Sequence, residues 1–217
     1  MSNPIEAVLV LLILSNLMLL ASGQLGACIR IVAIQGVLLG LLPVLVRIDD
    51  VTAAVVLLSL GSICLKGLVF PWLLSRALRE ASVAREVEPF VGYGVSLLVG
   101  VLFLAFSVWV GSRLTLPDPV VSPLVLPVAL FTVLVGLFLI VSRKKALTQV
   151  LGYLVFENGI YAFGVGLAQE APLLVEMGVL LDVFVAVFVM GITIFNINRE
   201  FDHIDTNRLS ALKDWTA

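Results

Sequence analysis

Two long apolar runs near the C-terminus, ALTQVLGYLVFENGIYAFGVGL at 146–167 and PLLVEMGVLLDVFVAVFVMGITIFNI at 172–197, indicate what kind of protein this is. At about 1.5 Å of rise per helical residue, each run is long enough to cross the roughly 30 Å hydrocarbon core of a bilayer. Each run also carries a carboxylate near its middle, Glu157 in the first and Asp182 in the second. A carboxylate at the bilayer centre costs on the order of 2.5–3.5 kcal/mol on insertion scales, so such residues usually face the interior of a helix bundle.

The rest of the chain has the composition of a membrane protein. Of its 217 residues, 61% are hydrophobic and 13% are charged, with a mean hydropathy of +1.17, whereas soluble domains carry about 25% charged residues. We therefore predict an all-α fold, a polytopic membrane bundle in contact with lipid, without a basic patch for nucleic acid. Hydropathy predicts seven transmembrane helices, at 4–21, 26–46, 51–74, 90–110, 123–141, 146–167 and 172–197.

The basic residues predict how this bundle is oriented. Ten of the 13 Lys and Arg residues lie in or beside the links after the first, third and fifth runs or in the tail 199–217. The opposite side carries Arg47 and Arg113. By the positive-inside rule the C-terminus is cytoplasmic and the N-terminus is outside. We interpret the basic loop Arg143-Lys144-Lys145 as a topological signal of the same kind.

The helix at 146–167 is expected to have two different faces. Gln149, Tyr153, Glu157 and Tyr161 recur every four residues, which places them in one polar stripe. A protonatable carboxylate among hydrogen-bonding groups is typical of a proton path. The opposite face carries small residues that allow another helix to approach closely, namely Gly152, Gly159, Ala162 and Gly166.

The third run carries a second unusual charge, Lys66. Pro71 has no N–H with which to bond the carbonyl of Gly67, so we expect the helix to kink or loosen beside the lysine. The polar residues expected on the same side of this helix as Lys66 are Thr52, Ser59 and Ser62.

Lys66, Glu157 and Asp182 lie at comparable depth in the predicted spans, which suggests a lateral chain of alternating charge. Two interpretations stay open at this point. The charges can form a static buried ion pair that determines helix packing, or they can transfer protons, with Lys66 setting the proton affinity of the carboxylates. Glu176, about one turn inside the last run, is a candidate for the outer mouth of such a path.

The sequence predicts no cofactor in this chain. Its two cysteines, Cys28 and Cys64, lie inside apolar runs, and its single histidine, His203, lies in the tail. Without a CxxC motif or a histidine pair, the chain lacks the ligands for a haem, an iron–sulfur cluster or nickel.

Four segments together resemble a known family: the Arg143 loop, QVLGYLVFENGIYAFGVG, LLDVFVAVFVMGI and NREFDHIDTNRLS. The last three helices resemble the small K-type subunit of respiratory complex I, in which a basic cytoplasmic loop precedes a glutamate in each of two helices. Glu157 corresponds to the first acid and Asp182 to the second, with Glu176 as the alternative. The full arrangement, including the lysine helix SICLKGLVFPWLLSRALRE, resembles the hydrogenase-4 membrane component E.

This resemblance implies an organisation and a set of partners. It divides the chain into a four-helix extension (1–122), a K-type module (123–198) and a cytoplasmic tail (199–217). It implies a multi-pass subunit of an energy-converting [NiFe]-hydrogenase or formate hydrogenlyase complex in a prokaryotic cytoplasmic (inner) membrane. Antiporter-like and quinone-site-like membrane subunits would be neighbours, and [NiFe]-hydrogenase and iron–sulfur subunits would hold the [NiFe] centre and the clusters.

The resemblance also implies roles for individual residues, in a chain that is not catalytic on its own. Glu157 would be the central carrier of the proton (or sodium ion), Asp182 would relay it toward the next subunit, and Lys66 would bias the proton affinity of the carboxylates. Tyr153 and Tyr161 of the polar stripe are counted with this translocation site. Two alternatives stay open: a non-conducting scaffold, and an independent secondary transporter, which is disfavoured because no inverted repeat stands out.

Overall fold

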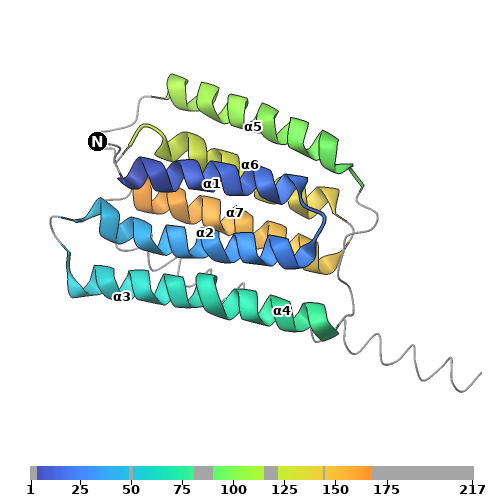
Figure 1. Ribbon diagram of the computed structural model, residues 1–217. Coiled ribbons are helices and arrows are strands. Elements are labelled where there is room, and N and C mark those ends of the chain that lie inside the picture. Colours follow the sequence, from blue (N-terminus) through green and yellow to red (C-terminus); the bar gives the residue numbers. More distant parts are fainter. Residues whose placement is uncertain (1–3, 49–50, 81–89, 115–121, 144, 168–217) are drawn as a thin grey trace, which may run out of the picture.

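The computed structural model describes residues 4–48, 51–80, 90–114, 122–143 and 145–167, and within them all regular elements are helices (Figure 1). In chain order these are α1 Pro4–Ala21, α2 Leu25–Val46, α3 Ala53–Ser62, the π-helix η1 Ile63–Val69, α4 Phe70–Glu80, α5 Tyr93–Arg113, α6 Val125–Ser142 and α7 Ala146–Leu167. We call the continuous run α3–η1–α4 the outer rod.

The helical membrane character predicted from hydropathy is confirmed. Among the described residues, five helices are long and apolar enough to cross a membrane: α1, α2, the outer rod, α5 and α6. The helix α7 has 22 residues, as many as α2, and carries Gln149, Glu157 and Asn158 within its apolar run. The predicted bounds 4–21 and 146–167 agree with α1 and α7. The predicted helix 172–197 lies outside the described residues, and the orientation stays a prediction.

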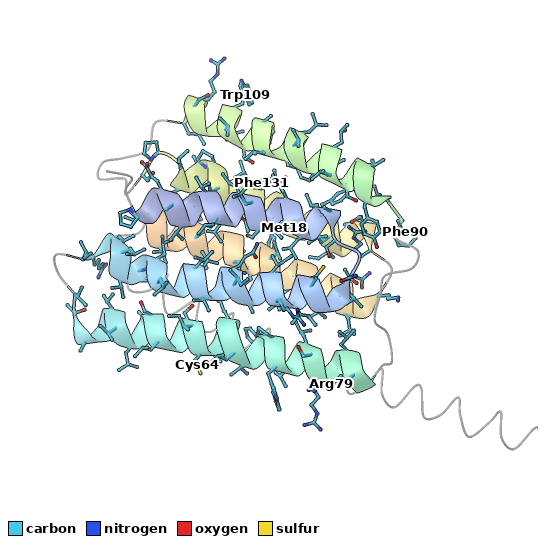
Figure 2. The ribbon with its side chains drawn as sticks, in the orientation of Figure 1. Met18, Cys64, Arg79, Phe90, Trp109 and Phe131 are labelled. Carbon is cyan, nitrogen blue, oxygen red and sulfur yellow. The ribbon has the colours of Figure 1, made fainter. Side chains whose placement is uncertain are left out.

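Four central helices are flanked by two outer elements. The helices α6 and α7 pack against each other, α2 contacts α1, α7 and the outer rod, and α1 contacts α5 and α6. Figure 1 shows α5 along one side of the bundle and the outer rod along the opposite side. Both outer elements turn large side chains away from the bundle, as Figure 2 shows for Trp109 of α5 and for Cys64 of the rod.

The apolar core is divided into two clusters, one toward each end of the bundle. One cluster lies where α1 and α6 end and α2 and α7 begin, and it includes Phe70 and Leu74 of α4. The other lies where α1 and α6 begin and α2 and α7 end. Between them, at the middle of the helices, lie buried polar and charged side chains: Ser15, Asn16, Gln35, Lys66, Thr132, Glu157 and Asn158.

The contact between α6 and α7 depends on small residues, as the sequence predicts. A Cβ added at Gly159 would lie 2.6 Å from the backbone nitrogen of Val133, and one at Gly152 would lie 2.8 Å from that of Ile140. A Cβ added at Gly166 would overlap the side chain of Val125, and Ala162 is 1% exposed. The small-residue face of α7 is therefore the face that packs against α6, which leaves Glu157 on another side.

The helix α2 approaches the outer rod equally closely. A Cβ at Gly36 would lie 2.6 Å from the backbone carbonyl carbon of Lys66, and one at Gly67 would lie 2.8 Å from the side chain of Val37. Because these glycines lack side chains, α2 and η1 pack backbone to backbone beside the lysine.

We expect Gly159→Ala to destabilise the protein by about 1–3 kcal/mol, because the new methyl group would overlap the α6 backbone, which cannot move aside cheaply. The matched control is Gly164→Ala in the same helix, where no atom lies within 4 Å of the added Cβ. Thermal unfolding of the purified chain in detergent measures both variants. Equal stability of the two variants would contradict the close packing of α6 and α7.

Candidate functional site

Lys66 lies in the middle of the wide helical turn η1. The backbone N–H of Phe70 donates to the carbonyl of Leu65, five residues back instead of the usual four. Pro71 follows immediately and cannot donate a backbone hydrogen bond. The predicted loosening beside the lysine is therefore confirmed in the form of a π-helix, a feature that is frequent at functional sites.

The ammonium of Lys66 binds the carboxylate of Glu157. Lys66 Nζ donates to Glu157 Oε1 at 2.7 Å, and the two side chains are 3% and 4% exposed. The Tyr161 ring lies beside this pair, with its centroid 4.5 Å from Lys66 Nζ, a distance suited to a cation–π contact. Two predicted site residues on α7, Glu157 and Tyr161, thus meet the lysine of the outer rod.

The other predicted site residues are placed differently. Tyr153 is half-buried, and its ring lies 6.2 Å from that of Phe156. Gln149 is exposed, and its Nε2 donates to the carbonyl of Arg143 at 3.2 Å. Asp182 and Glu176 lie outside the described residues, so the part of the charge chain that includes them stays a prediction.

The side of the outer rod that carries Lys66 is only partly as expected. Ser59 and Ser62 are buried on the same side as Lys66. Thr52 lies just before the first turn of α3 and not within the helix; it is exposed and accepts a hydrogen bond from the backbone N–H of Val55 at 3.4 Å as the N-cap. A threonine just before a helix is favoured as a cap, because its hydroxyl satisfies a free N–H of the first turn.

A buried amide network, missed by the sequence analysis, lies next to the ion pair. Gln35 Nε2 donates to Ser15 Oγ at 2.8 Å and to Asn16 Oδ1 at 2.9 Å. Asn16 Nδ2 donates to Thr132 Oγ1 at 2.8 Å, and Asn158 Nδ2 donates to Gln35 Oε1 at 3.4 Å. The network joins α1, α2, α6 and α7. Its sequence signal is an amide side chain in the middle of an apolar run, a weaker signal than a charge.

Two consecutive residues of α2 connect this network to the ion pair. Gln35 binds Asn158, the neighbour of Glu157, while Gly36 packs against the backbone of Lys66. The helix α2 therefore positions both partners of the pair at once.

Arg143, which the sequence suggests as a topological signal, also makes tertiary contacts. It is 1% exposed, and its Nη2 donates to the carbonyl of Leu20 at 3.3 Å. The guanidinium also lies over the Tyr93 ring, 4.7 Å from its centroid. Leu20 belongs to the last turn of α1, where the helix dipole favours a cation. Arg143 thus ties the ends of α1 and α6 to the start of α5.

The described residues contain no group of three or more His, Cys, Asp or Glu side chains that could hold a metal ion. The chemistry that this arrangement offers is the gain, loss or transfer of a proton at a buried carboxylate.

We expect Lys66→Met and Glu157→Met each to destabilise the chain by about 3–5 kcal/mol, because each leaves an uncompensated buried charge. The double variant removes both charges and should be more stable than the sum of the two single effects implies. Thermal unfolding in detergent of the four proteins measures this coupling. Strictly additive effects would contradict a direct ion pair.

We expect Gln35→Leu to destabilise the chain by several kcal/mol, at about 1–3 kcal/mol for each buried partner left without a hydrogen bond. Gln149→Leu is the control, since that exposed side chain makes a single bond to a backbone carbonyl. Denaturation of both variants in the same detergent provides the comparison, and a stable Gln35→Leu variant would count against the network.

The comparisons with known proteins agree with the resemblance to hydrogenase-4 component E. The chain is 35% identical over 210 residues to an uncharacterized protein of Mycobacterium tuberculosis (strain ATCC 25618 / H37Rv), covering 94% of this chain and 93% of that protein. It is 32% identical over 155 residues to hydrogenase-4 component E of Escherichia coli (strain K12) and of Shigella flexneri, covering 71% of this chain and 72% of those proteins. No protein-family model and no solved structure matches the chain. At this identity and coverage, the chain belongs to the hydrogenase-4 component E family.

Proposed function

We propose that this chain is a membrane subunit of a hydrogenase complex and that it takes part in proton (or sodium) translocation through the Lys66–Glu157 pair. Hydrogenase-4 component E of Escherichia coli is, by its name, a component of a hydrogenase. The observation that carries the translocation role is the ion pair itself, with 2.7 Å between Lys66 Nζ and Glu157 Oε1 and both side chains buried.

The pair can couple a proton to a movement of charge. When Glu157 binds a proton, its carboxyl group becomes neutral and no longer attracts the ammonium of Lys66. The lysine side chain is long and flexible, and it then moves toward another anion. Loss of the proton from Glu157 brings Lys66 back. In a low-dielectric interior each step has a large electrostatic effect, so a change of charge in a neighbouring subunit can drive it.

We assign the next step of this relay to Asp182, with Glu176 as the alternative. Both are acids of the 172–197 run that the K-type resemblance implies. Tyr161 takes part in the relay through its contact with Lys66. Tyr153 continues the polar stripe from Glu157 toward the start of α7.

We assign the redox chemistry to partner chains. An iron–sulfur cluster takes four cysteine thiolates, and this sequence has two cysteines in all. The [NiFe] centre and the clusters would lie on hydrogenase and iron–sulfur subunits, with quinone-site-like and antiporter-like membrane subunits beside this chain.

A second function, a scaffold that joins these subunits without conducting ions, is favoured by the exposed apolar faces of the outer elements. The largest exposures are those of Leu57, Leu60 and Leu68 on the outer rod and Leu98 and Leu102 on α5. Such faces suit contacts with other membrane subunits as well as with lipid.

We expect Glu157→Gln to preserve assembly and to lower ion pumping at least about tenfold, since a positioned proton-transfer group commonly contributes about 10²–10⁴ in rate. The glutamine keeps the volume of the side chain and an oxygen acceptor for Lys66. The matched control is Glu6→Gln, the same change at an exposed carboxylate of α1.

The measurement compares hydrogenase-driven ion uptake into inverted membrane vesicles with the amount of assembled complex. Full pumping in Glu157→Gln would refute the translocation role. Loss of assembly in parallel with activity would favour the scaffold.

A further inference from the structure

Four buried oxygen atoms around the ion pair have no hydrogen-bond partner among the described residues. They are Glu157 Oε2, the hydroxyl of Tyr161, and the hydroxyls of Ser62 and Ser59. The hydroxyls of Ser62 and Tyr161 are neighbours, although they do not meet the geometry of a hydrogen bond. Buried polar groups are nearly always hydrogen-bonded, because an unmet donor or acceptor loses its solvation without compensation.

The three hydroxyl groups lie on one side of the pair. Ser62 and Ser59 precede Lys66 by about one and two turns along the outer rod, and Tyr161 follows Glu157 by one turn of α7. The end of α7 and the end of α2, from which the chain enters α3, lie at the same end of the bundle. All three hydroxyl groups therefore lie between the ion pair and the end where α3 begins.

The opposite side of the pair is apolar. Phe70 and Leu74 of the outer rod, and Leu151, Leu154 and Val155 of α7, are buried there in one cluster, against which the half-buried Tyr153 packs. The amide network on the α1 and α6 side differs from the hydroxyl groups too, because Gln35 and Asn16 have partners for their side-chain nitrogens.

Water is the ligand that fits the four oxygens. A buried water makes about three hydrogen bonds, as donor and as acceptor, which matches a carboxylate oxygen beside hydroxyl groups. A sodium ion fits less well, because the Lys66 ammonium already neutralises Glu157 and a second positive charge in this low-dielectric site would be repelled.

We propose that Glu157 Oε2, Tyr161, Ser62 and Ser59 enclose a buried water pocket that connects Glu157 to the end of the bundle where α3 begins. Its role as the proton route to Glu157 rests on the proposed function, but the pocket itself does not. Val55 is buried on the same side of α3, between Ser59 and the exposed Thr52. Tyr161 packs against the apolar cluster at this end of the bundle, so in this proposal water exchanges slowly, past Val55 on the α3 side.

Thiol labelling in the assembled complex tests the pocket. Ser62→Cys and, as control, Leu154→Cys are made in a chain that also carries Cys28→Ala and Cys64→Ala. Both positions are buried, but Leu154 lies in the apolar cluster. A charged methanethiosulfonate reagent, added to right-side-out or inverted vesicles, reacts with the thiolate, which forms only in contact with water.

We expect Ser62→Cys to react at least about tenfold faster than Leu154→Cys, from one face of the membrane, and faster still when Val55→Ala is added. Equal rates at the two positions would overturn the proposal. Protection of Ser62→Cys by sodium, but not by choline at equal concentration, would overturn water in favour of a cation.

Hydroxyl-radical footprinting of the unmodified complex gives a second measurement, which does not depend on the folding of a variant. Tyr161 should be oxidised well above Phe131, a buried aromatic residue of α6 that is 0% exposed, because bound water supplies the radical. Equal oxidation of the two residues would overturn the pocket. The two proposals can fail separately. If Ser62→Cys is labelled but Glu157→Gln pumps normally, the translocation role is refuted and the pocket stands. If Glu157→Gln loses pumping but Ser62→Cys is not labelled, the pocket is refuted and the translocation role stands.

Discussion

The ion pair between Lys66 and Glu157 is the constraint on which the rest of this bundle depends. Neither charge can lie alone among apolar side chains, because a buried ion loses several kcal/mol of hydration that its partner must compensate. Lys66 comes from the outer rod and Glu157 from α7, 91 residues later in the chain. The outer rod, α2 and α7 must therefore meet at one depth, with the lysine and the carboxylate aligned.

The helix α2 makes that meeting possible through two adjacent residues with opposite properties. Gly36 has no side chain, so the backbone of η1 can lie against it. Gln35 has a side chain with two donors and an acceptor, and it uses them to bind α1 and α7. Close approach on one side and hydrogen bonding on the other let α2 contact both the rod that carries Lys66 and the helix that carries Glu157, which fixes the two charges relative to each other.

The polar groups around the ion pair have different hydrogen-bonding states. The amide network toward α1 and α6 is bonded among its own side chains, whereas the hydroxyls toward the start of α3 lack partners within the described part of the chain. This difference separates a structural region from one suited to water. Membership of the hydrogenase-4 component E family relates this arrangement to proteins that are named as components of a hydrogenase, and in our proposal Glu157 is the carboxylate that exchanges protons.

The sequence by itself determined the helices and the candidate charges. Apolar runs of membrane length predicted α1 and α7 with the observed bounds. Residue spacing predicted the small-residue face of α7, and the missing N–H of Pro71 predicted the loosened turn before it. Only the tertiary structure decided the partners. The bond from Lys66 to Glu157, the network of Asn16 and Gln35, and the burial of Arg143 join residues from different helices. Periodicity identifies the face of one helix, but the helix that covers this face depends on how all of them pack.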